Sequence, residues 1–122
     1  MTVKLKRAYD LPAEDDGERY LVERLWPRGV TKAELALTAW LKDLAPSTEL
    51  RKWYGHRPER WPEFIQRYQS ELSAPDKQAS LNDLAQKAQA GNVTLILSTK
   101  MTQISGAAVL RDVLTSLSPS PP

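Results

Sequence analysis

Hydrophobic side chains are spaced in two ways along this chain of 122 residues, and each spacing predicts a different kind of element. Residues 3–9 alternate charged and apolar positions, and residues 20–25 are rich in apolar and aromatic side chains, so both segments predict strands. Residues 93–97 form an apolar run that is typical of a central strand covered on both faces. The segment from 11 to 17 contains Pro12 and an acidic run, so it predicts a turn.

Helical spacing accounts for most of the other apolar positions. Thr31 and Glu34 form a capping box, which predicts the start of a helix that continues to Pro46. That helix would place four apolar side chains on one face, namely Leu37, Trp40, Leu41 and Leu44. Ser47 is a candidate N-cap of a short helix that Gly55 closes. Apolar stripes that end at Leu72, Ala88 and Leu117 predict three further helices.

The order of these elements is two strands, four helices, a strand and a helix. It predicts the α/β class, with one three-layer domain over residues 1–117 and a small, at least partly parallel sheet flanked by helices. Residues 118–122, which contain only Ser and Pro, are expected to form a disordered tail.

Composition excludes several kinds of site. The chain has no cysteine and one histidine, His56, so thiolate nucleophiles, disulfides and multi-ligand Cys or His metal centres are excluded, and we expect no metal and no cofactor. Hydrophobic residues at 41% and charged residues at 26% are typical of a soluble protein. The N-terminus lacks the apolar core of a signal peptide and no apolar run could span a bilayer, so we expect a cytoplasmic protein without a membrane partner.

Basic residues are clustered although the net charge is only +2. The segment from 51 to 60 has four basic side chains and a single acid, Glu59. Upstream, Arg24 and Arg28 flank a Trp-Pro pair in a loop that leaves the second predicted strand. Arginine is suited to bidentate recognition of phosphate or carboxylate, and ligands of α/β sheets bind at the carboxyl ends of strands. The alternative is a surface loop in which Trp26 covers the core edge and the arginines pair with acids.

Ser47, Arg51 and His56 form the second candidate group. A helix start at Ser47 would favour anions, although capping alone also explains this serine. His56 is the only side chain expected to titrate near neutral pH when unperturbed, which makes it the candidate catalytic acid or base; an exposed loop histidine is the alternative.

The segment Ser98-Thr99-Lys100 follows the predicted central strand, where α/β proteins bind ligands. The Walker A and Rossmann fingerprints and the Gly-x-Ser-x-Gly elbow are all missing from the sequence, which argues against a P-loop ATPase, a nicotinamide dehydrogenase and an α/β-hydrolase. Trp53 and Tyr54 lie beside basic residues and could stack on nucleic-acid bases, with core packing as the simpler alternative.

Three blocks of the sequence closely resemble the DUF488 family, in its short YeaO-like branch. The blocks are LVERLWPRGV at 21–30, AWLKDLAPS at 39–47 and LRKWYGH at 50–56. The resemblance implies a small bacterial α/β protein and no particular activity. The motif residues that it carries over are Arg7, Arg24, Trp26, Pro27, Arg28, Gly29, Lys42, Pro46, Ser47, Arg51 and His56.

One loop departs from the family pattern. Relatives usually have an acidic residue after the lysine that follows the last strand, and then a His-Asn pair before the final helix. Here Lys100 is present, but Met101, Ile104 and Ser105 occupy those positions. If this loop is catalytic in relatives, the present chain is a binding-only variant or takes a different ligand.

The sequence therefore predicts that the chain binds a small phosphorylated or nucleotide-like anion in an arginine-rich pocket. The expected ligand-binding residues are Arg7, Arg24, Trp26, Arg28, Lys42, Ser47, Arg51, His56 and Lys100. The alternatives are a nucleic-acid-binding or regulatory module that uses the same basic cluster, and a protein-interaction domain.

Overall fold

A computed structural model describes residues 2–117, and within them four parallel strands form one sheet in the order β1-β4-β2-β3. The strands are β1 (Thr2–Arg7), β2 (Glu18–Leu21), β3 (Ala39–Trp40) and β4 (Asn92–Leu97). The apolar strand β4 is central, since its Leu95 pairs with Leu5 of β1 on one side and with Tyr20 of β2 on the other. The predicted α/β class is confirmed, and every strand pair of the sheet is parallel.

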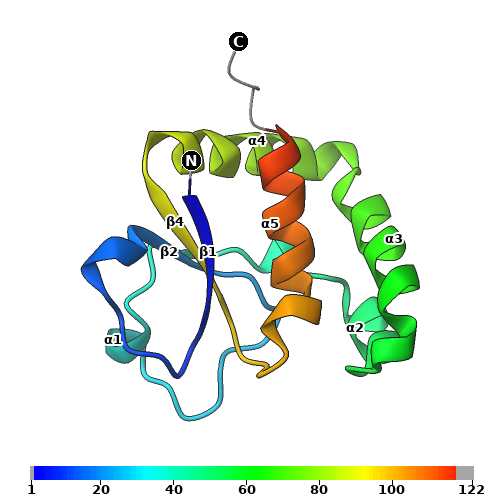
Figure 1. Ribbon diagram of the computed structural model, residues 1–122, viewed down its shortest axis with the longest axis horizontal. Coiled ribbons are helices and arrows are strands. Elements are labelled where there is room, and N and C mark those ends of the chain that lie inside the picture. Colours follow the sequence, from blue (N-terminus) through cyan, green and yellow to red (C-terminus); the bar gives the residue numbers. More distant parts are fainter. Residues whose placement is uncertain (1, 118–122) are drawn as a thin grey trace.

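One face of the sheet packs against helices that lie together in Figure 1. These helices are α2 (Thr48–Tyr54), α3 (Trp61–Leu72), α4 (Pro75–Ala90) and α5 (Gly106–Leu117). The predicted stripes of α3, α4 and α5 supply the buried side chains of this core, including Phe64, Tyr68, Leu84 and Leu110. The helix that Ser47 was expected to cap is also confirmed, because the Ser47 hydroxyl accepts a hydrogen bond from the Leu50 N–H.

The predicted helix from Thr31 to Pro46 is wrong beyond its first turn. The capping box of Thr31 and Glu34 is present, but α1 (Lys32–Leu35) ends where Ala36 adopts a left-handed conformation. The chain then extends into β3, and the Leu41 N–H donates to the Leu21 carbonyl of β2. The apolar positions do not share one face, since Leu37 and Trp40 pack on one side of the sheet and Leu41 and Leu44 on the other.

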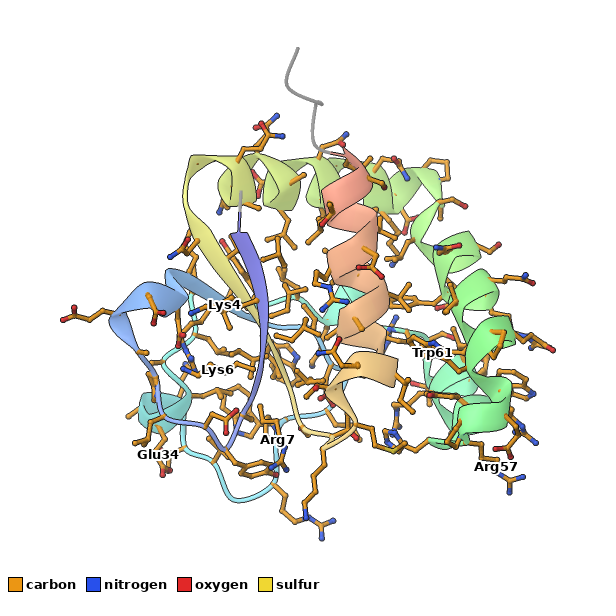
Figure 2. The ribbon with its side chains drawn as sticks, in the orientation of Figure 1. Lys4, Lys6, Arg7, Glu34, Arg57 and Trp61 are labelled. Carbon is orange, nitrogen blue, oxygen red and sulfur yellow. The ribbon has the colours of Figure 1, made fainter. Side chains whose placement is uncertain are left out.

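The opposite face of the sheet carries a smaller apolar cluster and a layer of buried charge. Leu21, Leu35 and Ile96 form the apolar part, which Trp26 and Trp40 cover. The charged part surrounds Asp16, in the turn η1 (Glu14–Asp16) that lies on the same side of β1 as Lys4 and Lys6 (Figure 2). The acidic segment expected to be only a turn thus also supplies a fully buried carboxylate.

Strand β2 ends earlier than predicted, and the residues that follow it form part of the candidate site. Pairing ends at Leu21, so Val22, Glu23 and Arg24 leave the sheet at the edge where the parallel strands end. No helix among residues 2–117 is long and apolar enough to cross a membrane. The predicted tail, 118–122, lies outside the described residues.

Candidate functional site

A cavity of about 270 Å³ opens at the carboxyl ends of β2 and β4. Five segments meet there: the residues after β2, the end of β4 with the residues after it, α2 with its flanking loops, one residue of α3, and the start of α5. The lining residues are Val22, Glu23, Arg24, Pro46, Arg51, Tyr54, His56, Phe64, Leu97, Ser98, Thr99, Ser105, Gly106 and Ala107. The cavity therefore lies where ligands of parallel α/β sheets bind.

Two arginines line this cavity. The Arg24 Nε donates to the Pro46 carbonyl at 3.0 Å, which holds the guanidinium group at the wall. Arg51 reaches the cavity from α2, and its side chain is exposed. Within residues 2–117, neither arginine forms an ion pair with an acidic side chain. Both positive charges are therefore available to an anion in the cavity.

His56 enters the cavity from a strained loop. Gly55 ends α2 with a φ of 52°, and His56 follows with a φ of 56°. A left-handed conformation costs a residue with a side chain about 1–2 kcal/mol, so the surrounding contacts must hold this backbone in place. Residues in such conformations often occur at functional sites. The single imidazole of the chain is exposed and lines the same cavity as the two arginines.

The first turn of α5 adds backbone donors. The Ser105 hydroxyl accepts the Ala108 N–H at 3.3 Å, while the N–H groups of Gly106 and Ala107 donate no hydrogen bond within residues 2–117. A Cβ atom on Gly106 would lie 2.9 Å from Pro46 Cγ, so glycine lets the start of the helix approach this wall. Free N–H groups and the helix dipole both favour a negative charge here.

Glu23 is a cavity residue that sequence reasoning missed as part of a site. Its carboxylate accepts a hydrogen bond from the Ser98 N–H and so connects the ends of β2 and β4. Burial raises its pKa, and the hydrogen bond from Ser98 together with the nearby His56 and Arg51 only partly offsets that effect. The available signal was an acid directly after an apolar strand, at the edge where the site was expected.

Ser47 is placed outside the cavity, although it was expected to bind the ligand. Its N–H and its hydroxyl both donate to the Glu71 carboxylate, at 2.9 and 2.5 Å. It lines a second cavity together with Glu71 and Lys77, and Arg24 borders both cavities. The free helix start at the main cavity is therefore that of α5 and not that of α2.

Other expected binding residues support the site or lie away from it. Arg7 donates to the Ser98 carbonyl at 3.1 Å and so fixes the loop after β4 from the end of β1 (Figure 2). Trp26 packs edge-on against Trp40 at 5.4 Å between ring centroids, and the Lys42 ammonium lies 4.2 Å from the Trp40 ring centroid.

Arg28 and Lys100 are exposed and do not line the cavity. Of the expected binding residues, the cavity thus brings together Arg24, Arg51 and His56. Among residues 2–117, no group of three or more His, Asp or Glu side chains could hold a metal ion.

Comparisons with known proteins give a consistent result over almost the whole chain. A family model described as "Inactive DUF488-N3 subclade" matches residues 2–118. The uncharacterized protein Rv3073c of Mycobacterium tuberculosis is 43% identical over 112 residues, which cover 92% of each chain. The uncharacterized protein YeaO of Escherichia coli is 42% identical over 118 residues, covering 96% of this chain and 100% of YeaO. No solved structure gives a significant match.

Proposed function

The chain belongs to the DUF488 family, in the subclade described as inactive, and on this premise we propose that it binds a small phosphorylated anion without chemically converting it. The observation that supports the proposal is the convergence of Arg24, Arg51 and His56 in one cavity at the carboxyl edge of a parallel sheet. Gly106 and Ala107, whose N–H groups donate no hydrogen bond within residues 2–117, line the same cavity.

Size and charge favour a small anion. A cavity of about 270 Å³ fits an inorganic anion or the phosphate-bearing end of a metabolite. Each hydrogen bond from a charged arginine would contribute about 1.5–3 kcal/mol to binding. Two arginines and a helix start would therefore give measurable affinity for a ligand that makes few other contacts.

The loop before α5 supports binding without conversion. Met101 and Ile104 occupy positions where the family usually has polar side chains, and neither can transfer a proton. Ser105, at the third such position, is used as a cap, because its hydroxyl accepts from Ala108 and donates to the Thr102 carbonyl. The description of the subclade as inactive agrees with this arrangement.

Contacts of Trp53 and Tyr54 disfavour nucleic acid as the ligand. The guanidinium groups of Arg60 and Arg67 lie 5.1 and 4.3 Å from the Trp53 ring centroid, so this ring is already covered. Tyr54 is buried, and its hydroxyl donates to the Ile104 carbonyl at 2.7 Å. Neither ring is free to stack on a base without rearrangement.

Titration calorimetry with phosphate and phosphate esters tests the proposal on the full chain. We expect saturable binding, and we expect Arg51→Ala to weaken it by about tenfold to a hundredfold because one charged hydrogen-bond donor is lost. Arg57→Ala is the matched control. Arg57 directly follows His56 but does not line the cavity, and it lies at the lower right of Figure 2. Arg28→Ala separates the cavity from the wider basic cluster, and it should also leave the affinity unchanged.

Two results would contradict the proposal. Equal losses in Arg51→Ala and Arg57→Ala would show that binding depends on general positive charge. Binding of oligonucleotides alone, with an affinity that falls steeply with salt, would support the nucleic-acid alternative.

A further inference from the structure

The cavity holds a carboxylate beside its arginines, and this combination is informative about the ligand. Glu23 lines the same cavity as Arg24 and Arg51, yet it forms no ion pair within residues 2–117. Its carboxylate accepts hydrogen bonds from Ser98 and from no other residue among 2–117. A carboxylate has about four acceptor positions on its two oxygens, so Glu23 has acceptor capacity left for a ligand.

A site that bound only a bare anion would be weakened by this group. A carboxylate repels phosphate, and in a half-buried setting water screens that repulsion less than it would at the surface. A ligand could instead bind the arginines through its anionic end and donate a hydrogen bond to Glu23. Such a ligand would use both the guanidinium groups and the carboxylate. The carboxylate would then discriminate against anions that lack donors.

The donor on the ligand is better matched by a hydroxyl than by an ammonium group. An ammonium group would gain attraction from Glu23 but would be repelled by Arg24 and Arg51, which line the same cavity. A neutral hydroxyl donates to the carboxylate without that repulsion. Apolar side chains of the wall, namely Val22, Leu97 and Phe64, supply contact for the carbon skeleton that carries both groups.

We infer that the ligand is a hydroxyl-bearing phosphomonoester of the sugar-phosphate type, with its phosphate held by Arg24 and Arg51 and a hydroxyl donating to Glu23. This inference rests on the proposed function and adds the chemical class of the ligand. Glu23 acts in it as a specificity-determining residue and takes part in no chemical step.

The test compares two phosphomonoesters that differ in hydroxyl groups, ribose 5-phosphate and methyl phosphate, by titration calorimetry. For the unmodified chain we expect ribose 5-phosphate to bind at least about tenfold more tightly, the value of one charged hydrogen bond. Glu23→Gln should reduce this preference to about twofold or less, because the amide is a weaker acceptor and no longer repels methyl phosphate. Glu49→Gln is the matched control, since Glu49 is an exposed acid of α2 outside the cavity, and it should keep the full preference.

The possible outcomes separate the inference from the proposed function. Equal affinity of the unmodified chain for both esters would overturn the inference and leave the proposed function standing. Binding of neither ester would overturn both. A preference that persists in Glu23→Gln would assign the selectivity to another residue and overturn the role of Glu23. The preference of the unmodified chain needs no variant, so it decides the ligand class even if Glu23→Gln does not fold.

Discussion

Asp16 precedes β2 in the sequence and Glu23 follows it. Both carboxylates are at least partly buried, but their surroundings differ. Burial would raise the pKa of Asp16, yet hydrogen bonds from the Ala13 N–H, Lys6 and Arg19 lower that pKa to about 2. Burial raises the pKa of Glu23, and its neighbours only partly offset the effect. Neighbouring groups thus compensate the negative charge of Asp16 for its burial, whereas they do not compensate that of Glu23.

This difference separates a structural from a functional carboxylate. Around Asp16 every group is paired: the Lys6 ammonium lies 3.0 Å from its carboxylate, and Arg19 also donates through Nε and Nη2 to the Leu35 carbonyl. Such a closed network holds η1, β1 and α1 together and leaves no position for a ligand. Around Glu23 the cations line an open cavity without pairing, which is the arrangement expected where a ligand completes the contacts.

The largest expected effect comes from breaking the closed network. Asp16→Asn should destabilise the fold by about 3–5 kcal/mol, because it leaves the buried Arg19 without its counter-ion. Urea unfolding measures this loss. Asp15→Asn is the control, since Asp15 is exposed and water screens its ion pair with Lys4, so its loss should change stability little. Similar losses in both variants would show that Asp16 has no special role.

Acid should remove part of this stabilisation without a substitution. The pKa of Asp16 is lowered from 3.8 to about 2 on folding, so its contribution is complete above pH 3.8 and is lost as the pH falls through about 2. The shift corresponds to about 2 kcal/mol. Urea unfolding between about pH 5 and about pH 2 should therefore show a steeper loss of stability in the unmodified chain than in Asp16→Asn. Parallel pH profiles would contradict the low pKa.

The fold could largely be predicted from the sequence because its strongest signals are local. The apolar run at 93–97 predicted the central strand, and the stripe of Phe64, Tyr68 and Leu72 predicted one face of α3. The error at residues 36–44 has a tertiary cause. Four apolar side chains at helical spacing suggested one face, but β3 pairs with β2 and divides them between two cores.

The candidate site was predicted only in part, because its geometry depends on pairings between distant segments. Arg24, Arg51 and His56 were chosen from charge and position, and the cavity brings them together. Ser47 does cap α2, as predicted, but it is not available to an anion. Nothing near it in the sequence indicates that Glu71 of α3 accepts its two hydrogen bonds. Glu23 gave the converse problem, since a single acid after a strand is common and only the contact with Ser98 shows its place.

Removing the charge of Glu23 should have a smaller effect on stability, and of opposite sign, than removing that of Asp16. We expect Glu23→Gln to stabilise the unliganded fold by less than about 1 kcal/mol, because it replaces an unneutralised carboxylate. A raised pKa means that the cost of the Glu23 charge is absent below pH 4.5 and grows as the pH rises through the folded-state pKa. The gain should therefore appear at neutral pH and vanish in acid, as urea unfolding at both pH values would show. Destabilisation at neutral pH would make Glu23 a structural group like Asp16.

Two residues in left-handed conformations should also have a small effect on stability; one borders the network of Asp16 and the other lines the cavity of Glu23. Ala36, with a φ of 48°, follows the Leu35 carbonyl that holds Arg19, and His56, with a φ of 56°, lines the cavity of Glu23. Glycine adopts this conformation without steric cost, so Ala36→Gly and His56→Gly should each stabilise the fold, by about 0.5–1 kcal/mol in urea unfolding. Their effects on ligand affinity should differ, because only His56→Gly removes a side chain from the cavity. Weaker binding of phosphate esters by His56→Gly alone would show that the strained backbone at His56 positions a ligand-binding side chain, whereas that at Ala36 serves only the fold. Equal affinities in both variants would show that His56 is not part of the site.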